Sequence, residues 1–402
     1  MFRYYKIDHK ALFIFGYFFY LFTPYLAGTF EGFRDYPGIL LYQTFFKQIP
    51  ANKIQSYLLI TLSWLPAFFL GHFCARLVWP VKRSLQLFSR TPLSLSVAYI
   101  AILLSFFLLL FGYLGRHSLF NAYGTYDVMA RGKISTLMVI YNFFLVYQLL
   151  TKQKPSFFLI AGTIITGLLL LSMGGRMYVT QTFIMYVVFK TSFSGNPWPV
   201  HKLVLFVLFA FVVSSFVGVW RQGASFNLNY SLYSLLAEPM FTWFSTSTFL
   251  INNDIPFINF PTNFFTSFIN LIPNTFGNAR QYVVSAQEMG YMYESPLGAD
   301  SVWTNFVINF GAGGSFIFVC ATGFILCALR HFSERNRFCA VYYILVCGIL
   351  PFQFFRDGFF ILNKQLFFNF LIIPGLVLLA MKLIIYFQNP ERNLLRTENK
   401  SL

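Results

Sequence analysis

Four arginines stand at the ends of long apolar stretches, where a charged side chain is uncommon, and a fifth lies within the loop between two such stretches. Arginine carries a planar fork of hydrogen-bond donors that matches the oxygens of a phosphate group. Several such side chains at one depth of a membrane would bind a polyanionic headgroup such as a diphosphate. The five are Arg131 in MARGK, Arg176 in GGRMYV, Arg221 in VWRQG, Arg280 in FGNARQ and Arg356 in FFRDG.

An alternative is that each arginine pairs with an acid or extends its charge toward the membrane surface. Arg356 has Asp357 beside it, and Arg131 has Asp127 one turn away. Arg176 and Arg221 have no acid close in the sequence. We therefore expect Arg176 and Arg221 to be the stronger candidates for a phosphate ligand.

Acids in the same segments could serve as a general base for a hydroxyl nucleophile. Asp300 is the favoured candidate because it stands just before the apolar segment that contains NFGAGG. The alternative for each acid is solvation of a loop, and His117 has a structural interpretation. The other candidate acids are Asp127, Glu238, Asp254, Glu288, Glu294 and Asp357.

The composition indicates that membrane-spanning helices position these residues. Hydrophobic residues make up 57% of the 402 positions, charged residues only 10%, and the mean hydropathy is +0.62. A soluble domain carries about 25% charged residues. The net charge of +16 is interpreted as membrane topology, and no nucleic-acid partner is expected because no basic block or RNA-binding motif occurs.

Ten segments are long and apolar enough to be spans of about 20 residues. The stretch 231–250 is nearly apolar enough, but Glu238-Pro239 stands at its centre, so we expect it on the membrane surface. The first apolar run lacks a cleavage site and is expected to be a retained span. The ten are 11–30, 55–76, 93–115, 134–151, 157–173, 174–192, 203–220, 302–329, 338–355 and 366–387.

Charge distribution sets the predicted orientation, with both termini in the cytoplasm. The segments then placed inside hold 18 of the 29 Lys and Arg residues but only four of the 13 acids, as the positive-inside rule requires. Residues 157–193 would form a helix of about 55 Å, too long for a hydrocarbon core of about 30 Å. Since both flanks are basic, the segment should turn back at Gly174-Gly175, placing Arg176 at the outer face.

The predicted fold is therefore an all-α polytopic membrane protein with a single membrane domain over 1–402. One large outer loop, 221–301, joins the seventh and eighth spans and is expected to cap the site. Its aromatic content and short amphipathic pieces such as 263–271 indicate an ordered cap. The five cysteines lie in or beside apolar spans and are expected to be core thiols, without a metal site.

Several motifs together resemble the bacterial O-antigen and oligosaccharide repeat-unit polymerases (Wzy type). They are GGR in the hairpin, WRQG before the large outer loop, NFGAGG in the next span and FFRDG near the end of the penultimate one. The likeness covers most of the chain in order and topology. An acidic residue is expected just before NFG, but Ile308 stands there, with Thr304 and Asn305 a few residues further upstream.

The resemblance implies an inner-membrane glycosyltransferase with its site at the periplasmic face. It implies that repeat units carried on undecaprenyl diphosphate are joined to one another, without a metal or other cofactor. Arg176, Arg221, Arg356 and Arg280 would contact the diphosphate. A chain-length regulator protein is left open as a partner.

Three other functions remain as alternatives. An O-antigen ligase has a related architecture, but ligases typically use an outer-loop histidine, and 221–301 contains none. A flippase or other transporter would favour charges at mid-membrane and repeated halves, which are not found. A structural partner in a polysaccharide export complex is the third.

Overall fold

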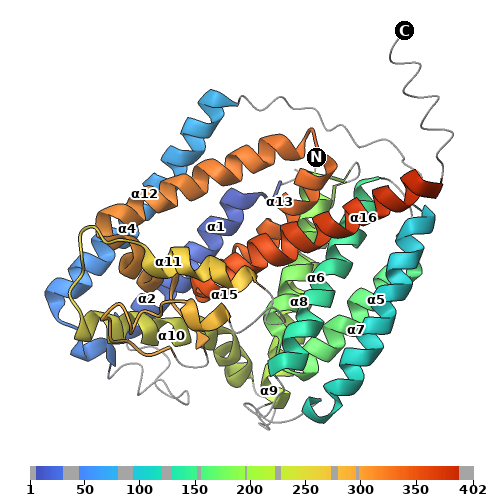
Figure 1. The fold of residues 1–402 in the computed structure, drawn as a ribbon. Coiled ribbons are helices and arrows are strands. Elements are labelled where there is room, and N and C mark those ends of the chain that lie inside the picture. The colour runs from blue at the N-terminus through green and yellow to red at the C-terminus, as the bar shows by residue number, and fades with distance from the viewer. Residues whose placement is uncertain are drawn as a thin grey trace.

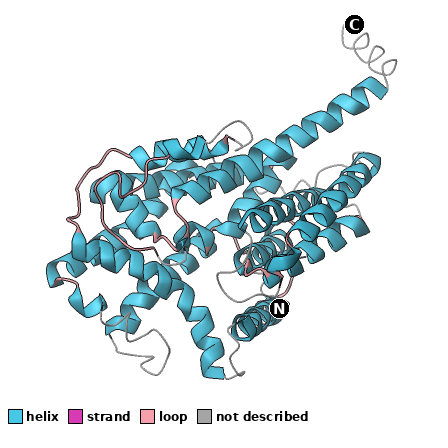
Figure 2. Cartoon of the chain, turned by 60° about the horizontal axis from the view of Figure 1, so that its bottom comes forward, coloured by secondary structure: helices cyan, strands magenta, loops and turns pink. Residues whose placement is uncertain are grey.

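The computed structural model is helical in all the regular secondary structure that it describes, in agreement with the predicted all-α class (Figures 1 and 2). Among the helix residues, some side chains are also outside the description. The described residues are 6–29, 45–79, 94–119, 128–151, 155–194, 197–221, 228–272, 279–295 and 298–388.

Two long helices cross closely on one side of the molecule (Figure 1). They are α4, Ala51–Val78, and α12, Val302–Ser333. A side chain at Gly71 would overlap the backbone of Cys320, and one at Gly323 would overlap that of Phe68. Small residues therefore permit this close approach, as they do between helices in membranes.

A second group of helices lies on the other side in Figure 1. Helix α6 packs against α5, α7 and α8, and α13 packs against both α8 and α12. Helix α13 thereby links the two groups. The bounds are α5 Ser94–Leu114, α6 Val128–Leu150, α7 Phe157–Ser172, α8 Arg176–Ser192, α9 Val200–Arg221 and α13 Arg337–Ile349.

Within the described residues, five helical segments are long and apolar enough to cross a membrane, which supports a helical membrane protein. The other predicted spans are also helical over most of their described residues, but the number of spans and their orientation stay predictions. The five are Ala51–Val78, Ala130–Leu150, Val200–Val217, Val302–Ser333 and Phe359–Ala380.

The predicted turn at Gly174-Gly175 is confirmed. Helix α7 ends at Ser172 and α8 begins at Arg176. Gly174 has a φ of 81°, a left-handed conformation that glycine adopts without penalty. The amide of Gly175 donates to the carbonyl of Leu170 at 2.6 Å. The chain reverses within three residues, and this reversal fixes Arg176 in the first turn of α8.

The stretch 231–250 forms most of helix α10, Leu228–Asn252. We expected it on the membrane surface, but from Pro239 onward it is largely buried in the protein. Trp243 and Phe249 are 2% and 0% exposed. The amphipathic piece 263–271 is helical as expected, forming α11, Thr262–Thr266, and the 3-10 turn η3, Ser267–Leu271.

The motif NFGAGG interrupts helix α12 and does not only allow neighbouring helices to pack closely against it. Gly311 has a φ of 74°, which breaks the helix. The outer loop fills the break, since the amides of Ala312 and Gly313 donate to the carbonyls of Pro256 and Phe257, each at 2.8 Å. Backbone groups freed by the break are thus paired, as burial requires.

A second interruption separates α13 from the last long helical segment. Helix α13 has 13 residues, a length of about 20 Å, and is followed by the single turn α14, Gln353–Arg356. Within a membrane, irregular backbone is tolerated where it is buried in protein or lines a polar cavity. The segment after it comprises α15 Phe359–Asn363, η7 Lys364–Ile372 and α16 Ile373–Gln388.

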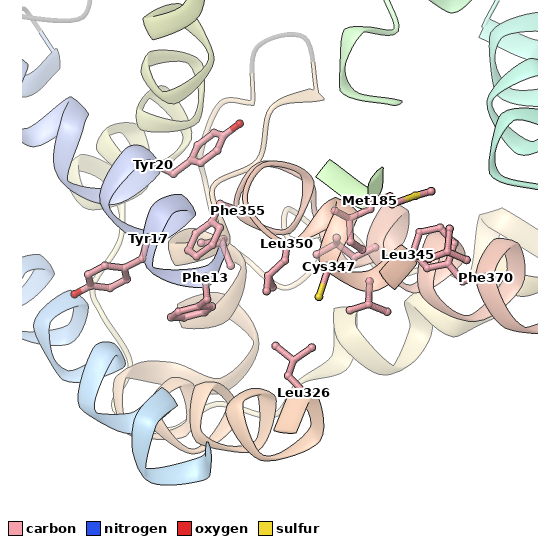
Figure 3. Close-up of a cluster of buried hydrophobic side chains, with 14 of the residues drawn as sticks. Phe13, Tyr17, Tyr20, Met185, Leu326, Leu345, Cys347, Leu350, Phe355 and Phe370 are labelled. Carbon is pink, nitrogen blue, oxygen red and sulfur yellow. The ribbon is translucent and has the colours of Figure 1, made fainter. Parts of the chain in front are cut away.

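The N-terminal helices pack onto this interruption. They are α1 His9–Tyr17, the π-helical turn η1 Phe18–Phe22 and α2 Thr23–Thr29. A side chain at Gly16 would lie 2.5 Å from the ring of Phe355. Figure 3 shows the buried side chains of this contact, with Phe13, Tyr17 and Tyr20 around Phe355.

We predict that Gly311→Ala destabilises the protein. The added methyl would meet the carbonyl group of Phe257 at 2.6 Å, and a non-glycine residue at this φ costs roughly 1–3 kcal/mol. Thermal unfolding of the purified protein in detergent should show a drop of several degrees. Gly375→Ala is the matched control, because nothing lies within 4 Å of its added methyl. Equal melting temperatures for the two variants would contradict the proposed role of the break.

Candidate functional site

Arg356 is held by two acids at the interruption between α13 and α15. Its Nε donates to Oε2 of Glu238 at 2.7 Å, and its NH1 donates to Oδ1 of Asp357 at 3.0 Å. The side chain of Arg356 is 19% exposed and that of Asp357 only 6%. Buried charges of this kind are stable only when paired, so the three side chains form one unit.

Glu238 joins Arg176 to this unit. Its Oε1 lies 3.7 Å from NH2 of Arg176, while its Oε2 binds Arg356. The carboxylate of α10 therefore stands between the guanidinium groups of α8 and α14. Two arginines that are far apart in the sequence meet at one acid. We call Arg176, Arg356, Glu238 and Asp357 the arginine cluster.

Asp300 lies beside the arginine cluster, just before α12. Its Oδ2 would be 2.7 Å from a methyl added to Gly358, which follows Asp357. The hydroxyl of Tyr293 donates to Oδ1 of Asp300 at 3.4 Å. The favoured candidate base and the arginine cluster thus share one neighbourhood.

Burial and neighbouring charges shift the pKa values of Asp300 and Asp357. Burial raises the pKa of Asp300 to about 6, and the negative charge of Asp357 adds to this shift. Burial also raises the pKa of Asp357, while the charge of Arg356 opposes the increase. Asp300 is therefore mostly ionised at neutral pH but can take up a proton more readily than an exposed carboxylate.

Hydroxyl side chains of α10 contact the residues at the start of α12 and so fix their position relative to Glu238. The amide of Ser301 donates to Oγ of Ser245 at 3.3 Å, and the hydroxyls of Thr246 and Thr304 are 3.4 Å apart. Ser245 and Thr246 lie about two turns beyond Glu238 on the same helix. The Ser/Thr run after Glu238-Pro239 therefore sets where Asp300 stands relative to the arginine cluster.

Of the predicted site residues, Arg176, Arg356 and Asp300 are brought together. Arg221 ends α9 and Arg280 lies in the short 3-10 helix Ala279–Tyr282, but both side chains lie outside what the structure describes. Asp127 lies outside the described residues altogether. Arg131 is in the first turn of α6, and Tyr178 is within electrostatic range of Arg131, Arg356 and Asp357.

The remaining candidate acids have other surroundings. Asp254 is exposed and lies 3.5 Å from Nζ of Lys53. Glu288 accepts from the amide and hydroxyl of Ser285, a local capping arrangement that lowers its pKa. Glu294 is exposed. These three acids therefore fit the alternative interpretation, in which an acid serves to solvate a loop.

Sequence reasoning did not find the partner of Arg176 or the neighbouring tyrosines. Glu238 was considered only as one loop acid among several, yet an acid and a proline inside an otherwise apolar stretch are themselves a signal. Tyr293 and Tyr20 gave no signal, because 24 tyrosines are spread along the chain. The pairing of Arg356 with Asp357, by contrast, could be expected because the two residues are adjacent in the sequence.

Comparisons of the chain with protein-family models, with curated proteins and with solved structures find no match. Within the described ranges, no group of three or more His, Cys, Asp or Glu side chains is placed to hold a metal ion.

The arginine cluster can bind an anion if a carboxylate moves aside. Two guanidinium groups face two carboxylates, so the charges within the cluster balance when all four groups are ionised. Arg176 makes the longer contact with Glu238, at 3.7 Å. Phosphate oxygens are better acceptors for a guanidinium fork than a loosely held carboxylate.

We predict that Arg356→Gln lowers the stability of the protein and that Asp357→Asn partly restores it. Removing the guanidinium leaves Asp357 buried without its cation, which costs roughly 3–5 kcal/mol. Neutralising Asp357 in the double variant removes much of that penalty. Thermal unfolding of the single and double variants measures both effects. A double variant that melts no higher than Arg356→Gln would show that the pair is not a buried charge unit.

Proposed function

We propose that the chain is a polymerase of the O-antigen type. It would transfer an oligosaccharide from one undecaprenyl diphosphate carrier to the repeat unit on another, at the periplasmic face of the bacterial inner membrane. The observation that carries the proposal is the convergence of Arg176 and Arg356 on Glu238, with Asp300 beside them. The likeness of the motifs to repeat-unit polymerases supports the same function.

The arginines would supply the electrostatic part of the reaction. The bond between the anomeric carbon and the diphosphate oxygen breaks, and the bonding electrons go to the diphosphate. Guanidinium groups fixed in a poorly hydrated site stabilise that developing charge without having to reorganise. Arg176 and Arg356 are 16% and 19% exposed, so water screens their charge little. This proposal requires no metal ion.

Asp300 would accept the proton from the attacking hydroxyl. The hydroxyl oxygen of the acceptor sugar forms the new bond to the anomeric carbon, and its proton passes to the carboxylate. A carboxyl with a pKa of about 6 is ionised at neutral pH and is a stronger base than an ordinary aspartate. The hydroxyl of Tyr293, 3.4 Å from Oδ1, orients the carboxylate for this role.

The large outer loop would cover the substrates. Its helices and turns contact the ends of the helices that carry the site; Asn270 donates to the carbonyl of Phe360 at 3.0 Å. Asn363 donates to the hydroxyl of Ser267 at 2.6 Å. A cap tied to α15 in this way would limit access of water to the glycosyl donor, which favours transfer to sugar over hydrolysis.

A deletion strain tests this function through the surface lipopolysaccharide seen on a gel. We expect a ladder with the wild-type gene, and only core or core with one repeat unit with Arg176→Ala or Arg221→Ala. Arg116→Gln is the matched control and should keep the ladder, because Arg116 is exposed and rests on the ring of Tyr113 outside the cluster. Protein levels of all variants must be equal in the membrane fraction.

The deletion phenotype separates the alternatives. Core with one repeat unit indicates a lost polymerase, because a separate ligase still attaches single units. Core alone, with lipid-linked polymer accumulating, would instead assign the ligase reaction to this chain. An unchanged ladder in the deletion strain would refute the O-antigen assignment and favour transport or another polysaccharide.

A further inference from the structure

Glu238 fills the position that an anionic ligand of the two arginines would take. Its two oxygens accept from Arg356 at 2.7 Å and approach Arg176 at 3.7 Å, as two oxygens of one phosphate group would. The carboxylate is 22% exposed, so it has a route to solvent. A ligand phosphate and Glu238 cannot both occupy the space between the guanidinium groups, because like charges at that distance repel.

The helix that carries Glu238 is weakened at the next residue. Pro239 lies inside α10 and lacks the amide that would bond to the carbonyl four residues earlier. The chain before Pro239 can therefore change direction at lower cost than the chain after it. Beyond Pro239, α10 is fixed by buried Trp243 and by the contact of Ser245 with Ser301. Glu238 thus directly precedes the fixed half of the helix.

A buried tyrosine hydroxyl without a described hydrogen-bond partner lies within electrostatic range of the arginine cluster. Tyr20 is 2% exposed, and within the described structure its hydroxyl has no hydrogen-bond partner. The hydroxyl is within electrostatic range of Glu238, Arg356, Asp357 and Arg176. Its ring stacks on Phe355 with an angle of 6°, and in Figure 3 the oxygen points away from the other labelled side chains.

A buried hydroxyl normally finds a partner, because leaving it unpaired costs free energy. The π-helical turn η1, Phe18–Phe22, sets the direction of Tyr20, and Gly16 allows this segment to sit directly on Phe355. The chain therefore holds this polar group in a position where it donates to none of the residues that the structure describes. Such a group is suited to a ligand.

We propose that Glu238 is an internal substitute for a diphosphate group and that Tyr20 is a further ligand-binding residue. When the diphosphate enters, its oxygens take the donors of Arg176 and Arg356, and Glu238 moves away about Pro239. The hydroxyl of Tyr20 then donates to the bound group. This inference rests on the proposed function only for the lipid nature of the ligand.

Direct binding measurements test the proposal on the purified full-length protein in detergent. The probes are farnesyl diphosphate and inorganic diphosphate, which separate a lipid headgroup from the free anion. Glu238→Gln keeps the shape of the side chain but removes the competing charge, so it should bind farnesyl diphosphate at least about tenfold more tightly than the wild type. Glu294→Gln, which alters an exposed acid elsewhere, is the control and should not change the affinity.

Tyr20→Phe tests the hydroxyl in the Glu238→Gln background. Losing one hydrogen bond to a charged group should weaken the binding of farnesyl diphosphate by about tenfold. The melting temperature should stay the same or rise, because an unpaired hydroxyl is removed. Equal affinity in Glu238→Gln and wild type would overturn the role of Glu238. Equal affinity with and without the Tyr20 hydroxyl would overturn the role of Tyr20. If Glu238→Gln does not fold, Glu238→Asp serves instead, since its shorter carboxylate cannot reach both guanidinium groups.

The two proposals fail in different ways. Tighter binding in Glu238→Gln together with an unchanged ladder in the deletion strain would retain the diphosphate site and reject the polymerase. A ladder that depends on Arg176, with no change of affinity in Glu238→Gln, would retain the polymerase and reject the internal substitute. Tight binding of inorganic diphosphate but not of farnesyl diphosphate would refute the lipid ligand.

Discussion

The ion pair between Arg356 and Glu238 is the contact on which the rest of the site depends. A guanidinium group and a carboxylate 2.7 Å apart can remain among apolar helices because each compensates the charge of the other. The same carboxylate reaches Arg176, so one acid holds together α8, α10 and α14. Without it, the positive charges of the two arginines would repel each other.

Interruptions in the helices create the room for these charges. The turn at Gly174-Gly175 makes Arg176 the first residue of α8, and the break after α13 places Arg356 at the end of the single turn α14, with Asp357 directly after it. The break at Gly311 receives the backbone of the outer loop. In each case backbone that leaves the regular helix is paired with other groups of the protein, which is the condition for irregular structure at membrane depth.

The helices and the turn at Gly174-Gly175 could be predicted, because apolar length, basic flanks and a glycine pair are local properties of the sequence. The pairing of Arg356 with Asp357 is equally local. The partner of Arg176 could not be predicted, since Glu238 lies far away in the sequence and several acids were equivalent candidates. The position of the Tyr20 hydroxyl and the docking of the loop at Gly311 depend on tertiary packing, which periodicity and composition do not encode. Burial of α10 was missed because Glu238-Pro239 looked incompatible with an interior helix.

The central claim is that the arginine cluster joins lipid-linked oligosaccharides. Reconstitution tests it most directly: the purified protein in lipid vesicles is given a repeat unit on undecaprenyl diphosphate, and the products are sized by mass spectrometry. From the wild-type protein we expect glycans of two or more units and one released undecaprenyl diphosphate for each new glycosidic bond. From the Arg176→Gln variant we expect neither product. A folded wild-type protein that leaves the repeat unit intact, or an Arg176→Gln variant that forms the same products, would contradict it.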